Sequence, residues 1–365
     1  MKKIKVYLQY PWKFLDSPYY NNLIQDPPKG IEYLNIQKQK GVITSAKKFA
    51  YMNRLKKVIR ATLSLVKMPN ITKTKKGDYD LIHCAHCLSL NKLPRVVDLE
   101  HYWNFASSGK VAYSEEGKNR IKKLLKSEYC KKIIPWTEAA KKTIIDALND
   151  KEIEKKVEVI YPAIPFPSFR KRKKEKIILL FVGRYFYWKG GLHALDTFDK
   201  ITKLHQNVEC IFVSEVPHNI LKKYSANKKI KFYGLMTQEK LFKLYSESDL
   251  FVYPGYSDTV GFGILEAMSF GLPVISVDGF ARKELIEDGK TGFIISNHEK
   301  INNEKIGEKE QEIIKRLIQK TSLLIENKNL REKMSKECIK SIKEGKFSIK
   351  ERNKKLEKIY ELALK

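Results

Sequence analysis

The chain has 365 residues, of which 42% are hydrophobic and 11% aromatic, with a formal net charge of +29. This composition excludes a disordered protein and suffices for two domains, and no apolar run reaches the roughly 18 residues of a transmembrane helix. The charge has three explanations: compositional bias on a solvated surface, a surface that meets anionic lipid, or a nucleic-acid site. No nucleic-acid-binding motif supports the third, so nucleic acid is not expected as a partner.

The basic N-terminus has neither the apolar segment nor the cleavage site of a signal peptide, and the chain has five cysteines, an odd number. Both observations predict a cytoplasmic protein without a disulfide framework. A peripheral position on the inner face of the cell membrane is compatible with that prediction.

The first half of the chain opens with a predicted strand over 3–10 and a proline-rich loop over 11–30. It contains no G-x-G-x-x-G fingerprint. Two basic helices are expected, over 46–68 and 117–133, and the first repeats apolar residues at helical spacing. Such a helix either lies on an anionic membrane surface or packs on the core and exposes its lysines.

Two short motifs in the first half imitate metal sites. Asp78-Tyr79-Asp80 is a D-x-D tripeptide, and His83, Cys84, His86 and Cys87 have metal-like spacing. The D-x-D tripeptide is short and precedes a strand. The His and Cys residues lie on a predicted strand, where adjacent side chains point to opposite faces. No further ligand pair lies nearby in the sequence. We therefore expect no metal site.

A candidate catalytic residue follows the short strand at Val96-Val97. His101 comes shortly after the end of that strand, where α/β sheets gather their functional groups. Residues 131–148 predict a strand and then a helix with Thr137 as N-cap. A strand is expected over 157–167, and the basic, proline-flanked segment after it predicts a domain boundary.

The second half alternates strands and helices through residue 295, which predicts a parallel, doubly wound domain. The strand that starts at 177 ends at Gly183, and Arg184 and Lys189 follow before a helix. Basic side chains beside a helix N-terminus suit a phosphate group.

A second strand–loop–helix–strand unit spans 250–277. Asp258 lies in its glycine-rich loop, and Glu266 lies more than one turn inside the helix. Two carboxylates around such a turn suggest either an acid–base pair or a ligand clamp.

Residues 177–296 resemble the donor-binding domain of GT-B glycosyltransferases, specifically the retaining family 4, or glycosyl transferases group 1. The family pattern G-R-x4-K-G occurs from Gly183 to Gly190, and the pattern E-x7-E occurs as Asp258 and Glu266. Glu284 begins an E-x-I-x-D-G-x-T-G run. The first acid of the pair is Asp where the family pattern has Glu, and the N-terminal half matches only weakly.

The resemblance implies an α/β GT-B fold, with two Rossmann-like doubly wound domains facing a central cleft. Residues 1–167 would form the acceptor-binding domain and 168–345 the nucleotide-sugar-binding domain. The helix within 346–365 would cross back to the first domain.

The resemblance also implies roles for particular residues. Arg184 and Lys189 would hold the donor diphosphate and stabilise the leaving group, without a metal ion or other cofactor. Glu266 would bind the ribose and Asp258 the donor sugar, and His101 would lie near the transferred sugar. The full donor-binding set is Gly183, Arg184, Lys189, Leu235, Asp258, Gly261, Phe262, Gly263 and Glu266.

The predicted function is metal-independent, retaining transfer of a hexose-type sugar from a nucleotide-sugar donor to a glycan or lipid-linked acceptor. A non-catalytic nucleotide-sugar-binding protein and a GT-B enzyme with a soluble acceptor are the alternatives.

Overall fold

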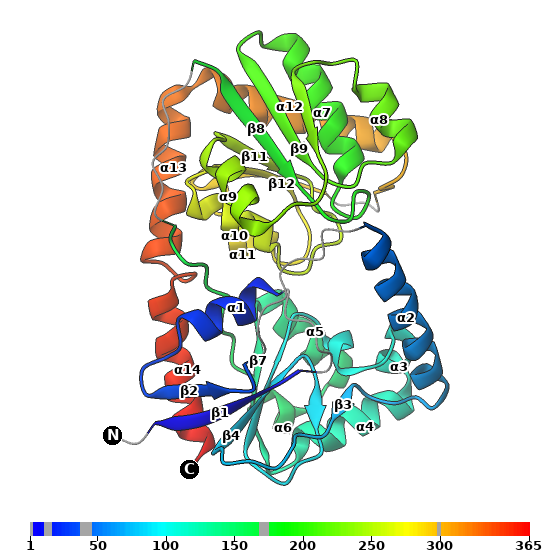
Figure 1. The fold of residues 1–365 in the computed structure, drawn as a ribbon, viewed down its shortest axis with the longest axis vertical. Coiled ribbons are helices and arrows are strands. Elements are labelled where there is room, and N and C mark those ends of the chain that lie inside the picture. The colour runs from blue at the N-terminus through cyan, green and yellow to red at the C-terminus, as the bar shows by residue number, and fades with distance from the viewer. Residues whose placement is uncertain (1–2, 11–16, 37–45, 168–174, 298–300) are drawn as a thin grey trace. The chain divides into compact units, whose positions relative to one another are not determined.

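The computed structural model describes residues 3–10, 17–36, 46–167, 175–297 and 301–365, without the side chains of 46–50, 52 and 53. The chain divides into two compact units (Figure 1). The first comprises Met1–Ala163 and Lys346–Lys365, and the second Ile164–Gly345.

The first unit is built on a parallel five-stranded sheet with the order β2-β1-β4-β6-β7. Its strands are β1 (Ile4–Gln9), β2 (Ile31–Leu34), β4 (Leu81–Ala85), β6 (Arg95–Leu99) and β7 (Cys130–Pro135). A small parallel sheet joins β3 (Ile71–Thr72) to β5 (Leu88–Ser89). Its helical segments are α1 (Pro18–Gln25), α2 (Ala46–Leu65), η1 (Tyr102–Phe105), α3 (Gly109–Tyr113), α4 (Glu115–Lys126), α5 (Glu138–Leu148), α6 (Lys151–Glu154) and α14 (Ile349–Ala363).

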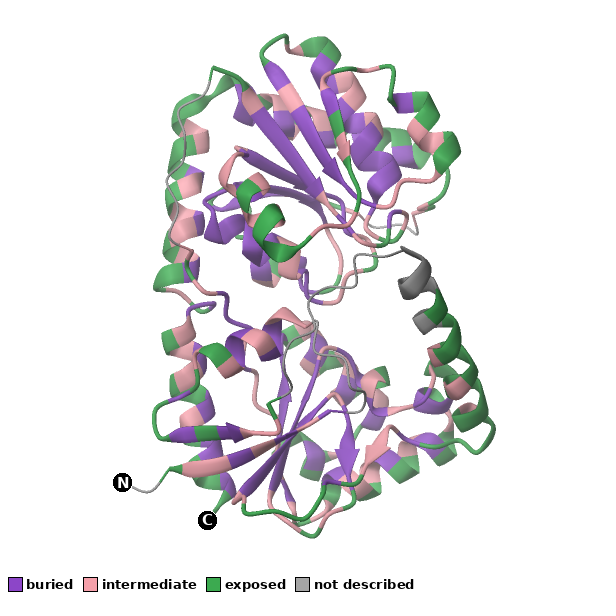
Figure 2. Ribbon diagram, in the orientation of Figure 1, coloured by how far each residue is buried: buried purple, intermediate pink, exposed green. Residues whose placement is uncertain are grey.

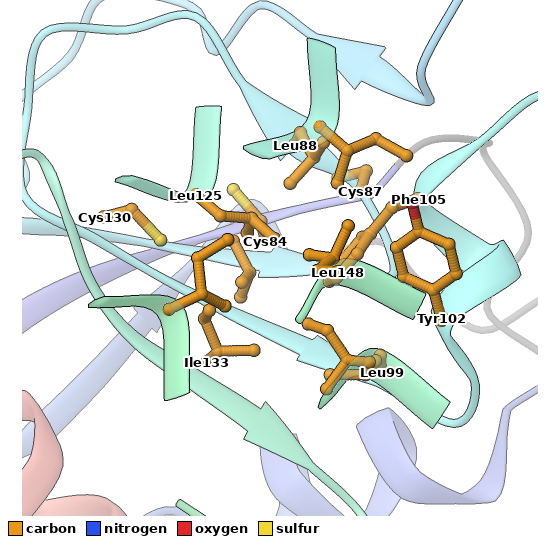
Figure 3. Packing of buried hydrophobic residues seen from close by; sticks show 14 of the residues in the cluster. Cys84, Cys87, Leu88, Leu99, Tyr102, Phe105, Leu125, Cys130, Ile133 and Leu148 are labelled. Carbon is orange, nitrogen blue, oxygen red and sulfur yellow. The ribbon is translucent and has the colours of Figure 1, made fainter. Parts of the chain in front are cut away.

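A buried apolar cluster fills the space between this sheet and the helices that follow it (Figure 3). Strand residues such as Cys84 and Ile133 pack there with Leu125 of α4 and Leu148 of α5. All five cysteines of the chain are buried free thiols.

The second unit is a parallel six-stranded sheet with the order β10-β9-β8-β11-β12-β13. Its strands are β8 (Ile177–Val182), β9 (Val208–Val213), β10 (Ile230–Tyr233), β11 (Leu250–Tyr253), β12 (Val274–Val277) and β13 (Gly292–Ile295). Its helices are α7 (Gly191–Leu204), α8 (His218–Tyr224), α9 (Gln238–Ser246), α10 (Phe262–Ser269), α11 (Arg282–Leu285), α12 (Glu308–Glu326) and α13 (Lys328–Lys343). The predicted doubly wound domain is confirmed.

Strand order reverses once in each sheet, between β8 and β11 in the second unit and between β1 and β4 in the first. Ligands of open α/β sheets bind in the crevice at the carboxyl ends of the strands on either side of such a reversal. These two places are therefore the candidate ligand sites of the two sheets.

Three predicted segments are wrong. Within the expected loop over 11–30, α1 forms because Pro18 suits a first helical position and Tyr19 and Leu23 are buried. The expected helix over 117–133 ends at Lys126, since Cys130–Pro135 pairs with β6 as a strand.

The expected strand over 157–167 makes only one bridge in the described chain, from Val157 to Ile133. Its prolines cannot donate ladder hydrogen bonds. The predicted boundary at 167/168 adjoins residues outside the description, and the two compact units divide after Ala163.

A buried polar network joins the last helix to the sheet of the first unit. His83 Nε2 lies 2.9 Å from Asp98 Oδ2, and His83 Nδ1 lies 2.7 Å from the Tyr360 hydroxyl of α14. Tyr20 donates to Asp98 Oδ1 at 2.6 Å. Burial alone would raise the pKa of Asp98, but His83, His86 and Tyr20 together hold that pKa below its usual value. His83 is therefore committed to a structural contact.

Replacing Asp98 should destabilise the first unit strongly. Asp98→Ala leaves the buried Tyr20 hydroxyl and His83 ring without their acceptor, which costs on the order of 3 to 5 kcal/mol. Urea denaturation read by hydrogen exchange in β4 and β6 measures this loss. Asp78→Ala, which removes an exposed ion pair with Lys5, is the matched control and should change little. Equal effects of the two variants would contradict the structural role of Asp98.

Candidate active site

Two loops meet at the strand-order reversal of the second unit. One follows β8 and spans residues 183–190, and the other follows β11 and spans 254–261. Gly255 N donates to Lys189 O at 3.1 Å, and Ser257 N donates to Trp188 O at 3.2 Å. Backbone hydrogen bonds therefore fix the two loops to each other before any ligand binds.

Gly190 allows the two loops to approach each other closely, and Gly183 allows Lys189 to pack against the end of β8. Gly190 has φ +73°, and a Cβ added to it would lie 2.5 Å from the Cβ of Pro254 in the opposite loop. A Cβ added to Gly183 would lie 2.9 Å from the Cβ of Lys189. Both contacts are shorter than side chains tolerate, so glycine here keeps Lys189 against the end of β8.

The structure brings Lys189 and Asp258 together across the two loops. Lys189 Nζ lies 2.9 Å from Asp258 Oδ1, with both side chains largely buried. Tyr253 donates to Asp258 Oδ2 at 2.6 Å. Burial acts to raise the pKa of Asp258, but Lys189, Arg282 and the Tyr253 hydrogen bond outweigh it and hold that pKa below its usual value. Asp258 is therefore a carboxylate with both oxygens engaged.

Arg282 is a site residue that sequence reasoning missed. Its side chain is fully buried, and its guanidinium donates to the carbonyl oxygens of Gly255, Asp258 and Val260. These bonds hold the second loop in one conformation and place a second cation near Asp258. Arg282 lies two residues before Glu284, which begins the E-x-I-x-D-G-x-T-G run. An arginine on a short helix gives no reason to expect a buried side chain that binds a neighbouring loop.

Glu266 lies in α10 and is 9% exposed. The Tyr245 hydroxyl lies 3.3 Å from Glu266 Oε2. Burial raises the pKa of Glu266 to about 7, although the Tyr245 contact opposes this shift. A buried carboxyl group with so few donors can accept further hydrogen bonds, for which a vicinal diol is well suited.

The N-terminus of α10 supplies the third part of the site. Gly261 has φ +92°, and a Cβ there would lie 3.0 Å from Arg282 Nη1. Phe262 and Gly263 form the first turn of the helix. Backbone N–H groups of a first helical turn have no partner within the helix, and they attract anions.

Arg184 and Leu235 occupy the same edge of this sheet. Arg184 directly follows Gly183 at the end of β8 and is half-buried. Leu235 follows β10 and is also half-buried. Since β10 is two strands from β8, the backbone near Leu235 lies about 10 Å from the end of β8 along this edge. A ligand that reaches both residues is larger than a phosphate group.

His101 lies in the first unit, as the N-cap of η1. Its Nδ1 accepts from Trp103 N at 3.3 Å, and its ring stacks on the Trp103 ring at 3.7 Å. Burial lowers the pKa of His101 to about 4. His101 is thus neutral near pH 7, with its proton on Nε2, so it can donate one hydrogen bond but supplies no positive charge.

The two metal-like motifs have structural roles. Lys5 pairs with Asp78 through its side chain and with Asp80 through its backbone N–H, which fixes the start of β4. His83 and the backbone of His86 bind Asp98. Across the described ranges, His, Cys, Asp and Glu form no group of three that could hold a metal ion.

Comparison with known proteins shows which family the second unit resembles. Residues 166–341 match the model of the family "Glycosyl transferases group 1". An uncharacterized glycosyltransferase from Methanocaldococcus jannaschii is 26% identical over 74% of this chain and 69% of its own length. A Klebsiella pneumoniae protein from a cps region is 26% identical over 39% of this chain. That match spans 42% of the Klebsiella protein, less than half its length.

Solved structures extend the likeness to both units. A glycosyltransferase from Rickettsia africae superposes with a TM-score of 0.64 at 14% identity, over 100% of this chain and 99% of that chain. Anabaena Alr3699/HepE in complex with UDP-glucose gives 0.61 at 15% identity, over 98% and 99%. The predicted GT-B fold is confirmed. Residues 166–341 match the model of the group 1 glycosyl transferases, which supports the predicted enzyme class.

The raised pKa of Glu266 predicts a pH-dependent stability. The folded state binds this proton more tightly than the unfolded state, whose carboxyl has the ordinary pKa of 4.5. The contribution of Glu266 to the free energy of unfolding is complete below pH 4.5 and is lost as the pH rises through about 7. Relative to wild type, Glu266→Gln should therefore gain up to about 3 kcal/mol between pH 4 and pH 8.

Thermal unfolding of both proteins across this pH range tests the prediction. Glu239→Gln, on the exposed side of α9, is the matched control. A stability difference between Glu266→Gln and wild type that stays constant with pH would refute the buried, protonated Glu266.

Proposed function

We propose that this protein is a retaining, metal-independent glycosyltransferase that moves a hexose-type sugar from a nucleotide-sugar donor to a glycan or lipid-linked acceptor. The single observation that carries the proposal is the arrangement at the strand-order reversal of the second unit. Lys189 and Asp258 lie on two loops that backbone hydrogen bonds hold together, and α10, which follows the second loop, adds its N-terminus and the buried Glu266. Together these groups could bind a diphosphate and a ribose in one site.

The donor would bind through an exchange of ion-pair partners. In the structure Lys189 is paired with Asp258. A diphosphate carries more negative charge than one carboxylate, and with Arg184 and the start of α10 beside it, it would draw Lys189 away. Asp258 would then be available to a hydroxyl of the donor sugar. As a Glu would reach one methylene further, Asp258 requires the sugar to lie closer to the loop.

Glu266 would accept hydrogen bonds from the ribose hydroxyls, and Leu235 would lie along the base. The cations Arg184 and Lys189 would stabilise the negative charge that develops on the leaving nucleotide, the part that a metal ion plays in other transferases. His101, neutral at pH 7, would donate a hydrogen bond through Nε2 to the transferred sugar or to its acceptor.

UDP-sugars are the first donors to test, since the Anabaena neighbour was solved with UDP-glucose. A non-catalytic nucleotide-sugar-binding protein would bind the same donors without turnover. Release of UDP from a donor panel, with acceptor lipids present and absent, distinguishes this alternative from an enzyme.

Membrane attachment is the other part of the proposal, and the two basic helices differ in their support for it. The apolar residues Ile121 and Leu125 of α4 are fully buried in the core, so α4 exposes only its polar side. None of the described side chains of α2 is buried, and Tyr51, Val58 and Leu65 are more than half exposed. Figure 2 shows most of the described part of α2 as exposed. We therefore assign contact with anionic lipid to α2.

Among the described residues, no helix combines the length and apolarity needed to cross a bilayer. An attachment through α2 would be interfacial, with the apolar side chains at the acyl boundary and the lysines and arginines at the headgroups.

Removing the Lys189 ammonium should weaken nucleotide binding. Lys189→Ala deletes a charge-assisted contact to the diphosphate, so the Kd for UDP should rise about 10- to 100-fold while that for uridine stays unchanged. Titration calorimetry measures both. Lys203→Ala, on the exposed side of α7, is the matched control.

Because Lys189→Ala also leaves Asp258 without its cation, a second variant keeps the experiment interpretable. Lys189→Ala/Asp258→Asn removes both charges, and it should lose UDP affinity to the same extent as the single variant. Wild-type UDP affinity in both variants would refute the phosphate role of Lys189.

Breaking the apolar surface of α2 should release the protein from anionic vesicles. Leu55→Asp/Leu65→Asp should sediment with phosphatidylglycerol vesicles several-fold less than wild type at low salt, because the charged side chains oppose burial at the acyl boundary. Leu204→Asp makes the same change at an exposed leucine of α7. Equal losses in the two proteins, or no binding by wild type, would contradict attachment through α2.

A further inference from the structure

Lys189 and Arg282 reach the loop after β11 from its two neighbouring strands. Strand β11 lies between β8 and β12 in the second sheet. Lys189 belongs to the loop after β8, and Arg282 begins α11, the short helix that follows β12. The loop that carries Asp258 therefore receives one cation from each side of its own strand.

The two cations bind different atoms of this loop. Lys189 Nζ pairs with the Asp258 carboxylate at 2.9 Å. Arg282 binds the backbone instead, since its Nη2 donates to Gly255 O and, at 3.1 Å, to Asp258 O. Its Nη1 donates to Val260 O at 3.4 Å. An incoming anion can therefore take Lys189 without breaking a hydrogen bond of Arg282.

The backbone of the loop is packed closely around the guanidinium group. A Cβ added to Gly255 would lie 2.9 Å from Arg282 Nη2, and a Cβ added to Gly261 would lie 3.0 Å from Nη1. Both distances are shorter than side-chain contacts tolerate. The guanidinium thus keeps one position, in contrast to a lysine side chain, whose single charged group can turn to a new partner.

The charge of Arg282 is buried without a direct counter-ion. Its side chain is fully buried, and in the part of the chain that the structure describes its donors meet carbonyl oxygens and no carboxylate. A buried cation without an ion-pair partner is costly. A residue that only held the loop would not need this charge, because neutral donors also bind carbonyl oxygens. The carboxylate on which the charge acts is Asp258, whose pKa Arg282 helps to lower.

Lys189, Arg282 and Tyr253 are the described groups that face the Asp258 carboxyl and lower its pKa. Tyr253 belongs to β11 and donates to Asp258 Oδ2 at 2.6 Å. Of these three groups, Lys189 is the one that a diphosphate would take. Because burial favours a neutral carboxyl group, Asp258 then needs another positive charge to stay ionised. Arg282 is in place to supply it.

We propose that Arg282 is a positioning residue for sugar transfer. It holds the loop that carries Asp258, and it supplies the positive charge that stays beside this carboxylate after Lys189 has turned to the donor diphosphate. Asp258 then remains an ionised acceptor for a hydroxyl of the donor sugar. The inference rests on the proposed glycosyltransferase function, and it concerns how the site binds the sugar rather than the nucleotide.

Titration calorimetry with UDP in two buffers of different ionisation enthalpy measures the protons that binding takes up. At about pH 6, Arg282→Gln should take up more protons than wild type, by up to about one per site, because Asp258 loses both cations and becomes protonated. Arg282→Lys keeps the charge and should restore the wild-type uptake. Arg282→Gln/Asp258→Asn should lose the additional uptake, which assigns the proton to Asp258.

Lys283→Gln is the matched control for the proton uptake. It removes a cation from the next residue of α11, where the exposed Lys283 pairs with Asp278, and it should take up as many protons as wild type. Equal uptake by Arg282→Gln and wild type would overturn the proposal. So would an Arg282→Lys variant that behaves like Arg282→Gln, since the charge would then be irrelevant. Arg282→Met, also uncharged, replaces Arg282→Gln if thermal unfolding shows that the latter does not fold.

A comparison of UDP-glucose with UDP tests the consequence for the sugar. Arg282→Gln should lower the affinity for UDP-glucose about tenfold more than the affinity for UDP, as expected for a weakened hydrogen bond to a charged group. A purely structural role of Arg282 would weaken the binding of both ligands by the same factor, and that result would overturn the proposal.

Variants without Lys189 separate this proposal from the donor assignment, because they need no ligand. Carboxyl NMR of protein with ¹³C-labelled aspartate should give Asp258 a higher pKa in Lys189→Ala/Arg282→Gln than in Lys189→Ala. The same pKa in both variants would overturn the role of the Arg282 charge. If the pKa differs but wild type binds neither UDP nor UDP-glucose, the donor assignment fails and the effect of Arg282 on Asp258 stands.

Discussion

The ion pair between Lys189 and Asp258 determines what the loops after β8 and β11 can bind. It joins the loop after β8 to the loop after β11. Arg282 holds the second loop by donating hydrogen bonds to three of its carbonyl oxygens. One carboxylate therefore faces two cations at the start of a helix. This excess of positive charge favours an anion, and an anion that takes Lys189 changes the partners of Asp258 in the same step. Asp258 thus stays engaged for as long as Lys189 is paired with it.

The first unit depends in a similar way on a single carboxylate. Asp98 accepts from Tyr20 of α1 and from the backbone of His86, and His83 connects it to Tyr360 of α14. Because this group is buried, each of those contacts is stronger than it would be in water, and the loss of any one is costly. Asp98 therefore fixes the last helix to the sheet and also holds the backbone of His86 at the carboxyl end of β4.

The strands of the second unit could be predicted from sequence because each is a short apolar run between glycines or charged turns, such as Val274–Val277 after Gly271-Leu272-Pro273. The spacing of Gly183, Lys189, Asp258 and Glu266 likewise identified one site. Sequence could not show that Lys189 pairs with Asp258 or that Arg282 clamps the loop, since both contacts depend on how distant loops pack. Sequence also could not show whether Pro18 begins a helix or lies in a loop. Burial of the neighbouring tyrosines favours the helix there.

The two basic helices show why composition alone cannot explain the charge of +29. Both have apolar residues at helical spacing, and both are rich in lysine. In α4 those apolar residues face Cys130 and Ile133 in the core, so its lysines are an ordinary solvated face. In α2 the equivalent residues have no buried position among the described side chains, so the helix keeps apolar and basic groups on the surface together. Compositional bias and lipid contact are therefore compatible explanations that apply to different helices.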